Sequence, residues 1–442
     1  MSYSLSKKFT FGSLLVFALP TTIMMMVMSL YTIIDGVFVS RFVSTNALSA
    51  INIVYPAINI VLGISVMLAT GSNAIVARKM GEGRPESARK TFTAIVLLNL
   101  LIGAAIGIVG NIFAVPLARM LGASDLILAD CVTYLRWQIG FSPALMLQLL
   151  FQSYFITEGR PGTGLFLTIL AGVANAVLDY VFIIPLQMGI AGAAIATVVG
   201  YMIPATAGLI YFAVSRKSLW FVKPKLPAAE LADSCINGSS EMVTNLSSGI
   251  ITFLFNQLLI RYAGEDGVAA ITIIQYAQFL LNALFMGFSQ GVSPVISYNH
   301  GSGNHGQLKQ IFKTSVIFTC ITSVCIFAFA QLAGDLVVTV FARPETSVYE
   351  LASRGLAIFS VCFLFSGINT FSSALFTALS DGKISAIISF MRTFGMIVTS
   401  LLILPSLFGI NGVWMAVPAA ELFGMIMCLH YIRKYRGVYH FQ

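Results

Sequence analysis

The sequence of 442 residues has few charged side chains and very few histidines. Charged residues make up only 10% of the chain, and four histidines are present. Two of these, His300 and His305, lie in one loop, and His430 and His440 lie near the C-terminus. The long apolar segments therefore contain no combination of nucleophile, base and metal ligands. An intramembrane enzyme is not expected, and no catalytic residue is predicted.

Cysteine patterns and nucleotide-binding motifs are also missing. The six cysteines lie in apolar segments and lack the spacing of a metal site or a disulfide framework, so we expect them to act as small apolar residues. The closest approach to a phosphate-binding loop, GEGRPESARK from Gly81, lacks the Lys-Ser/Thr pair. No bound cofactor and no metal are predicted, and the energy for any uphill process would have to come from an ion gradient.

Apolar segments are what the sequence has in abundance. Hydrophobic residues make up 57% of the chain, in runs longer than the ~20 residues that cross a bilayer. Charged and Gly/Pro-rich breaks divide the chain into twelve candidate membrane spans, so an all-α integral membrane protein is predicted. The spans are expected at residues 9–38, 47–77, 90–114, 127–155, 163–184, 190–214, 229–261, 267–298, 308–332, 349–379, 384–405 and 410–432.

Lysine and arginine predict how the chain is oriented. With the N-terminus in the cytoplasm, most basic residues fall in inner loops, and the outer loops keep only a few arginines such as Arg119 and Arg343. Both termini are thus predicted to be cytoplasmic, in the cell inner (plasma) membrane. The net charge of +8 is explained by this asymmetry, and a nucleic-acid partner is not needed to explain it.

The chain also repeats itself with a shift of 220 residues. Six predicted spans in each half make the halves parallel copies related by an axis along the membrane normal, an arrangement common among transporters. We predict an N-terminal lobe at 1–216, a cytoplasmic linker at 217–228 and a C-terminal lobe at 229–442. The matching pairs include Gly81/Gly301, Gly83/Gly303, Phe151/Phe371, Pro185/Pro405, Gly189/Gly409 and Gly192/Gly412.

Two acidic residues inside predicted spans are the main candidates for function, because an ionisable group in hydrocarbon is costly. Asp35 lies six residues before Arg41, and Asp179 six before Pro185, so both are expected roughly 9 Å below the outer boundary. Asn175 lies one helical turn from Asp179. Thr197, Tyr134 and Gln138 are expected at a similar depth and complete the predicted polar cluster.

The second half of the repeat does not keep this cluster. At the 220-residue shift, Asp35 aligns with Phe255, Asp179 with Thr399 and Thr197 with Val417. Two adjacent carboxyls in a low-dielectric pocket cannot both ionise cheaply, so they could take up and release a proton. The same oxygens could instead surround Na⁺. The sequence leaves both options open.

Several motifs resemble the multidrug and toxic compound extrusion (MATE) transporters, in particular the bacterial DinF-like and MepA-like branch. The resemblance covers almost the whole chain. The motifs that carry it are DGVFVSRF from Asp35, GEGR from Gly81, TEGRPG from Thr157, NAVLDYVFI from Asn175 and MGIAGAAIAT from Met188.

The resemblance implies two six-helix bundles and efflux of organic, mostly cationic amphiphilic compounds by cation-coupled antiport. It implies that Asp35, Tyr134, Asn175, Asp179 and Thr197 belong to a cation-coupling network, with H⁺ or Na⁺ as the coupling ion. Glu158 also matches an acidic position of the family, although a solvated loop charge or a conformational latch is an equal alternative. Pro20 stands at the place of a proline proposed to bend the first span.

Further candidates lie elsewhere in the chain. Glu241 and Glu421, in predicted spans of the second lobe, could attract a cationic substrate or could instead form structural hydrogen bonds. Met24 and Met28 could line a pocket for varied amphiphiles, or could face lipid. Function as a monomer in contact with membrane lipid is expected. A flippase for a lipid-linked or anionic substrate is the alternative, and it would favour a basic cavity.

Overall fold

The computed structural model describes residues 5–225 and 227–440, and within these ranges the regular structure is helical, without strands. One bundle contains α1 (Phe11–Phe42), α2 (Thr45–Gly81), α3 (Pro85–Ile112), α4 (Ala114–Met120), α5 (Leu128–Gly140), α6 (Ser142–Thr157), α7 (Pro161–Ile183) and α8 (Gly189–Val214). The other contains α9 (Ala228–Gly301), α10 (His305–Thr339), α11 (Ser347–Phe359), α12 (Phe363–Ala378), α13 (Gly382–Phe390), α14 (Met396–Phe408) and α15 (Ile410–Tyr435). We call them the N-bundle and the C-bundle.

The expected twelve spans are present. Ten helical segments in the described part of the chain are long and apolar enough to cross a membrane, and the pair α5–α6, bent by 50°, makes eleven. The 74 residues of α9 would extend about 110 Å if straight. Gly264, with φ 63° and ψ −149°, breaks α9 into two antiparallel arms, residues 228–263 and 265–301, and so supplies the twelfth span.

Three local features were not predicted. The expected span 127–155 is bent at Phe141, between α5 and α6. Pro143 lies in the first turn of α6, a position at which proline fits the start of a new helix. The short helix α4 lies between α3 and α5. Residues Met391–Gly395 form a π-helical turn between α13 and α14, a feature often found at functional sites.

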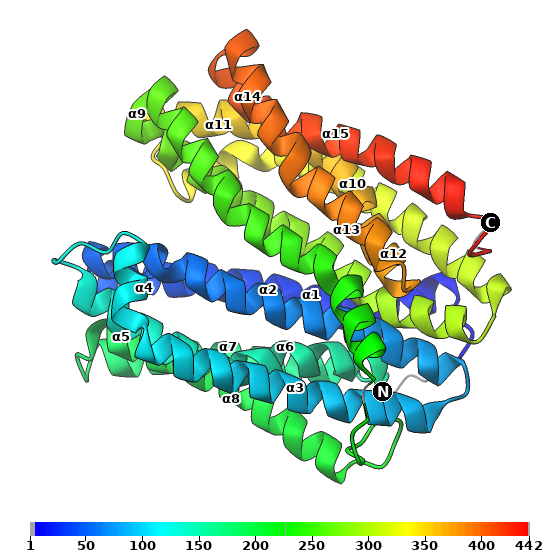
Figure 1. Ribbon diagram of the computed structural model, residues 1–442. Helices are drawn as coiled ribbons and strands as arrows, with labels where there is room; N and C mark the ends of the chain where they lie inside the picture. Colours follow the sequence, from blue (N-terminus) through cyan, green and yellow to red (C-terminus); the bar gives the residue numbers. More distant parts are fainter. Residues whose placement is uncertain (1–4, 226, 441–442) are drawn as a thin grey trace.

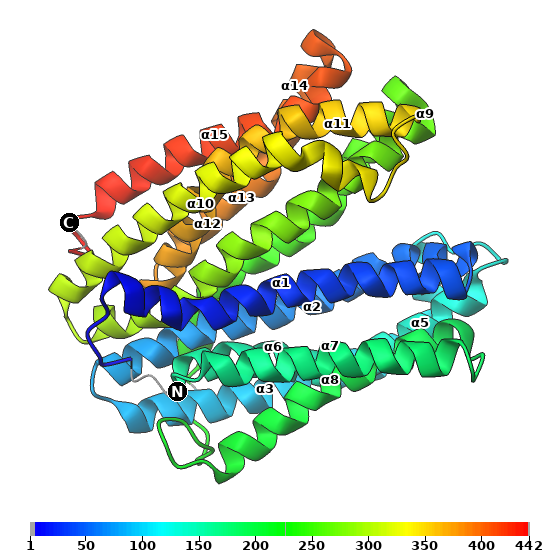
Figure 2. The ribbon, with the colours of Figure 1, turned by 180° about the vertical axis from the view of Figure 1, so that it is seen from behind.

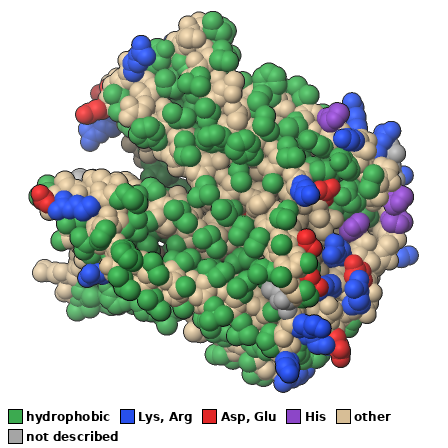
Figure 3. Space-filling view, viewed as in Figure 1, with side chains coloured by type: hydrophobic (Ala, Val, Ile, Leu, Met, Phe, Trp, Pro, Cys, Tyr) green, Lys and Arg blue, Asp and Glu red, His purple; other side chains and the backbone are tan. Residues whose placement is uncertain are grey.

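The two bundles meet at one end of the molecule and separate at the other. The described part of the chain begins and ends at the closed end, which we call the termini end (Figures 1 and 2). At the opposite end, the cleft end, a hollow opens between the bundles, and histidine and most basic side chains gather instead at the termini end (Figure 3). The outline is therefore a V whose arms are the bundles.

Small residues close the seam at the termini end. α1 and α2 make the most extensive contacts of the N-bundle with α9. A Cβ atom on Gly238 would lie 1.9 Å from the backbone oxygen of Met67, and one on Gly71 would lie 2.0 Å from that of Ser234. A Cβ on Gly81 would meet the oxygen of Tyr298 at the same distance. Helix backbones therefore touch directly, which only glycine permits.

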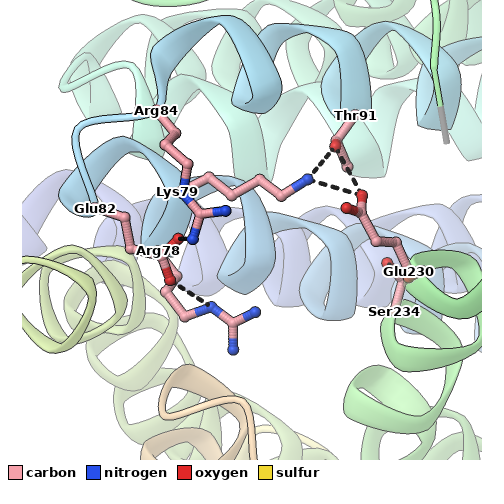
Figure 4. Close-up of polar contacts among 7 residues, drawn as sticks. All are labelled: Arg78, Lys79, Glu82, Arg84, Thr91, Glu230 and Ser234. Carbon is pink, nitrogen blue, oxygen red and sulfur yellow. Dashed lines mark hydrogen bonds and ion pairs between the residues drawn. The ribbon is translucent and has the colours of Figure 1, made fainter. Parts of the chain in front are cut away.

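An ion pair reinforces the same junction. Lys79, only 6% exposed at the end of α2, donates to Thr91 of α3 (2.9 Å) and to Glu230 at the start of α9 (2.7 Å) (Figure 4). Thr91 also donates to Glu230 (3.2 Å). A buried ammonium is tolerated here because its hydrogen bonds replace water. The contact connects the N-bundle to the first arm of α9.

Candidate functional site

An acid pair lies inside the N-bundle near the cleft end. Asp35 is in the last part of α1 and Asp179 in the last part of α7, and the two helices pack against each other. Each carboxyl lies within electrostatic reach of the other, close enough for a hydrogen bond between the two side chains. Such a bond can form only when one carboxyl carries a proton, because two carboxylates offer only acceptors. Asp179 is 1% exposed, and Asp35 is half-buried.

The helical repeat of α7 explains why these groups share a face. Pro161 occupies the first turn, and the buried side of the helix then carries Thr168, Asn175 and Asp179 at intervals of seven and four residues. These spacings place the three side chains in one line along the helix. The face that packs into the bundle is thus polar in an otherwise apolar segment.

Four tyrosines surround the acid pair. Tyr134 on α5 interacts electrostatically with both carboxyls, and Tyr201 on α8 with that of Asp35. Tyr31, one turn before Asp35 on α1, and Tyr55 on α2 belong to the same group of interacting side chains. The site is therefore built from five helices. Apolar rings exclude water around the acids, and the hydroxyls remain available as hydrogen-bond partners.

A small cavity lies inside the bundle, one helical turn along α1 and α7 from the acid pair. Its lining includes Tyr31, Gln148, Thr168, Asn175, Thr197 and Tyr201. Thr197 donates its hydroxyl to the backbone oxygen of Ala193 (2.9 Å), so its lone pairs remain as acceptors. The cavity joins residues from α1, α6, α7 and α8.

Several buried polar atoms of this region lack a partner among the described residues. They are one oxygen each of Asp35 and Asp179, the amide nitrogen of Asn175, the side-chain oxygen of Gln148 and both amide atoms of Gln138. Buried polar atoms are normally satisfied, so such a concentration is suited to bound water or a cation. The oxygens can coordinate a hard cation, and the amide nitrogens can order water.

The structure therefore brings together most of the residues predicted to couple ions. Asp35, Asp179, Tyr134, Asn175 and Thr197 share one region, and Gln138 lies one turn from Tyr134 on the buried face of α5. Their role in coupling stays a prediction. Sequence reasoning missed Tyr31, Tyr55, Gln148 and Tyr201. Tyr31 and Tyr201 could have been found, because they lie four residues from Asp35 and Thr197 on the same helices.

Glu158 is not part of this cluster. It caps α6 at the termini end and accepts hydrogen bonds from the backbone N–H groups of Ser218 (3.1 Å) and Leu219 (2.8 Å). It is only 7% exposed, so the alternative of a solvated loop charge is wrong. Burial raises the pKa of the Glu158 carboxyl, and the two N–H donors together with nearby Arg160 and Arg89 oppose that rise.

The beginning of the segment between the bundles is fixed by further contacts with the N-bundle. Arg89 donates to the backbone oxygen of Ser218 (2.9 Å), and its guanidinium lies 3.4 Å from the ring centroid of Trp220. The N–H of Val222 donates to Thr93 (3.1 Å). The predicted linker at 217–228 thus starts as part of the N-bundle, and its residue 226 lies outside the described residues.

The two acids of the C-bundle have different surroundings. Glu421 on α15 is 7% exposed, accepts from Asn369 (2.6 Å) and pairs with Arg392 (3.7 Å). Its charge is therefore already compensated inside the bundle. Glu241, on the first arm of α9, is half-buried and interacts electrostatically with Arg392. Of the two, Glu241 is better placed to meet a substrate.

The remaining candidates lie on α1. Pro20 is inside the helix, which continues through it from Phe11 to Phe42. Met24 is 2% exposed and lies near Gly164 of α7, so it contributes no open surface to the cleft in this conformation. Met28 is half-buried. Within the described ranges, no group of three or more His, Cys, Asp or Glu side chains could hold a metal ion.

Two bundles of membrane spans around a cleft, one of them holding a buried acid pair, define a multi-pass membrane transporter. The chain belongs to the MatE family, whose pattern matches residues 20–181 and again residues 241–402. The family pattern thus occurs once in each bundle, as expected from the internal repeat. A transporter, not an enzyme, is the class that this membership implies.

Named relatives and solved structures agree with this assignment. Multidrug export protein MepA of Staphylococcus aureus (strain bovine RF122 / ET3-1) is 24% identical over 428 residues, which cover 95% of this chain and 92% of that protein. The crystal structure of MATE in complex with MaL6 has a TM-score of 0.93 at 22% identity and covers 98% of both chains. An outward-facing conformation of a multidrug resistance MATE family transporter of the MOP superfamily has a TM-score of 0.91 at 22% identity, over 98% and 97% of the two chains. These structures establish the shared fold.

Proposed function

We propose that this protein exports organic, mostly cationic amphiphilic compounds by antiport, with protons as the coupling ion. The observation that carries the proposal is the close approach of the buried Asp35 and Asp179 carboxyl groups, which can share a hydrogen bond only when one of them carries a proton. Loss of that proton would leave two carboxylates side by side in a dry site. Their repulsion would favour another arrangement of α1 and α7.

The proton gradient would supply the energy. One elementary charge that crosses 100 mV releases about 2.3 kcal/mol, enough for a concentration ratio of several tens. In the proposed cycle, protons enter the cluster from outside, the organic cation leaves outward, and proton release inside resets the transporter. Pro20, which removes a backbone hydrogen bond from α1, would let this helix bend as the cluster changes its protonation.

The cleft is the proposed route. The concentration of basic side chains at the termini end supports placing that end in the cytoplasm and the protein in the plasma membrane (Figure 3). The cleft end would then face outward, and transport would proceed by rocking of the two bundles about the glycine seam. All parts of this cycle lie within one chain, which supports function as a monomer surrounded by lipid.

The proposed substrate class rests on two half-buried side chains, one in each bundle. Glu241 supplies a carboxylate near the bundle interface, and Met28 supplies a flexible thioether, a pairing that suits varied amphiphilic cations. The MepA relatives are named as multidrug export proteins, which supports the same class. Glu421 is not assigned to the substrate, because Arg392 already compensates it.

The test is transport of ethidium in proteoliposomes with pH and Na⁺ gradients imposed separately. A pH gradient alone should drive ethidium exchange, and Asp35→Asn and Asp179→Asn should each abolish it while the protein still inserts. Asp125→Asn is the matched control, because this carboxylate in the same bundle is 92% exposed. Transport driven by Na⁺ alone would replace the proton by sodium. Normal pH-driven exchange in both variants would eliminate the assigned role of the pair.

A further inference from the structure

The internal repeat is precise enough to compare the two bundles position by position. Gly83 and Gly303 have φ angles of 73° and 66°, and Gly189 and Gly409 have 57° and 59°. These backbone conformations, which favour glycine, recur at the 220-residue shift on both sides of the bundles. Each residue of the N-bundle cavity can therefore be assigned a counterpart in the C-bundle.

The counterpart of the cavity is almost entirely apolar. Gln148, Thr168 and Thr197 line the N-bundle cavity, and their counterparts are Ile368, Ile388 and Val417. These three are between 0% and 8% exposed. Hydrocarbon thus fills the place where the N-bundle keeps amide and hydroxyl groups.

Two positions break this pattern. Arg392 is the counterpart of Gly172, and Glu421 is the counterpart of Tyr201, both of which line the N-bundle cavity. Arg392 and Glu421 form an ion pair with a separation of 3.7 Å, and their side chains are 11% and 9% exposed. A glycine that leaves room for a cavity in one bundle is therefore replaced by a cationic side chain in the other.

The surroundings hold Arg392 in this position. Its guanidinium donates to Thr370 (3.0 Å), and Asn369 donates to the other oxygen of Glu421 (2.6 Å). Arg392 belongs to the π-helical turn Met391–Gly395. A Cβ on Gly424 would lie 3.2 Å from Cγ of Arg392, so this glycine leaves space for the arginine stem. The Nε atom of Arg392 is buried and lacks a partner among the described residues.

We propose that Arg392 is a tethered cation that fills the C-bundle counterpart of the ion-coupling cavity and so confines ion coupling to the N-bundle. The proposal rests on the proposed function of the acid pair. An ion pair already satisfies Glu421, and the guanidinium also lies within electrostatic reach of Glu241. In the C-bundle the guanidinium already occupies this place and compensates the acid, whereas the N-bundle keeps a cavity beside an acid pair for which no basic partner is seen among the described residues.

Removal of the arginine side chain should expose a latent cation site. Arg392→Ala empties the volume of the guanidinium and leaves Glu421 unpaired, so a small cation of the same shape should bind there. The probe is methylguanidinium, and methylurea is its neutral counterpart of similar shape. Thermal unfolding of the purified full-length protein in detergent measures binding, because a ligand that prefers the folded state raises the unfolding midpoint.

We expect methylguanidinium, and not methylurea, to raise the midpoint of Arg392→Ala. The wild type and Arg261→Ala should show no such rise, since Arg261 is exposed and its removal opens no buried space. The double variant Arg392→Ala/Glu421→Gln should lose the effect. Equal shifts with methylurea, or a shift that persists in the double variant, would overturn the proposal.

A second variant covers the case in which Arg392→Ala does not fold. Arg392→Gln keeps most of the stem and removes the charge, so the Glu421 carboxylate loses its cationic partner and becomes available to a coupling ion. The number of ions exchanged per ethidium in proteoliposomes should then exceed that of the wild type, and an unchanged number contradicts the proposal. Absence of ion-coupled transport in the wild type would instead refute the proposed function, and the methylguanidinium experiment would still test the latent site.

Discussion

The glycine seam predicts that one methyl group at the right place changes the conformation of the transporter. In Gly238→Ala, the new Cβ would lie 1.9 Å from the oxygen of Met67, a distance that real contacts do not allow. The first arm of α9 and α2 must therefore separate by at least about 1 Å. Overpacking of this kind costs about 1–3 kcal/mol, which disfavours the state with a closed seam roughly 5- to 150-fold.

The assay is the distance between spin labels on the two bundles at the termini end. Cysteines at Glu86 and Lys309, in a background without the six native cysteines, place one label at the start of α3 and one at the start of α10. Both positions are exposed. Gly238→Ala should increase the population with a long distance between the labels, because the seam opens as the bundles rock.

Gly249→Ala is the matched control on the same arm of α9. A Cβ at Gly249 meets nothing within 4 Å, so this variant gains the helix propensity of alanine without a steric clash. Its distance distribution should equal that of the labelled parent. Identical distributions for Gly238→Ala and Gly249→Ala, with both proteins folded, would refute the idea that backbone contact at the seam holds the termini end closed.

Three further outcomes follow from groups at the termini end. Burial raises the pKa of Glu158, so its contribution to stability is present at low pH and is lost as the pH rises through the folded-state pKa. The unfolding midpoint of the wild type should therefore fall relative to that of Glu158→Gln as the pH rises above about 4. Glu230→Gln removes the carboxylate that pairs with the buried ammonium of Lys79 and should cost about 1–3 kcal/mol of unfolding free energy. The control Glu86→Gln removes an 84% exposed partner of a 3.7 Å pair and should cost below about 0.5 kcal/mol. Equal losses in the two variants would contradict the role of burial. Arg89→Lys weakens the stacking on Trp220 and should lower the free energy of unfolding by about 0.5–1 kcal/mol. The chain after Trp220 should then be cleaved faster by a protease. An unchanged cleavage rate would contradict the idea that this contact holds the inter-bundle segment on the N-bundle.

The twelve spans were predictable because helix length in a membrane is set by bilayer thickness. The depth of Asp35 and Asp179 followed from the fixed rise of the helix, and counting from Arg41 and Pro185 placed both acids at one level. The break of α9 at Gly264 was also expected, between spans ending at 261 and starting at 267. These successes depend on regular geometry.

Features that depend on tertiary contacts were not predictable in this way. The environment of Glu158 is created by backbone N–H groups of Ser218 and Leu219, which lie about sixty residues away in sequence and carry no side-chain signal. The pairing of Arg392 with Glu421 requires packing of α15 against the π-helical turn Met391–Gly395. The local sequence does not predict that turn. The bend at Phe141 likewise depends on how α5 and α6 pack.

The fixed start of the inter-bundle segment limits how far the two halves can separate. Val222 is bound to Thr93 of the N-bundle, the N–H of Lys225 donates to the backbone oxygen of Lys90 (3.5 Å), and α9 begins at Ala228. Three peptide units therefore connect the last of these contacts to the C-bundle, and a fully extended chain of this length spans at most about 11 Å. Pro227 restricts it further. The widest possible aperture on this side is therefore set by a covalent tether, which also bounds the size of cargo that can enter there.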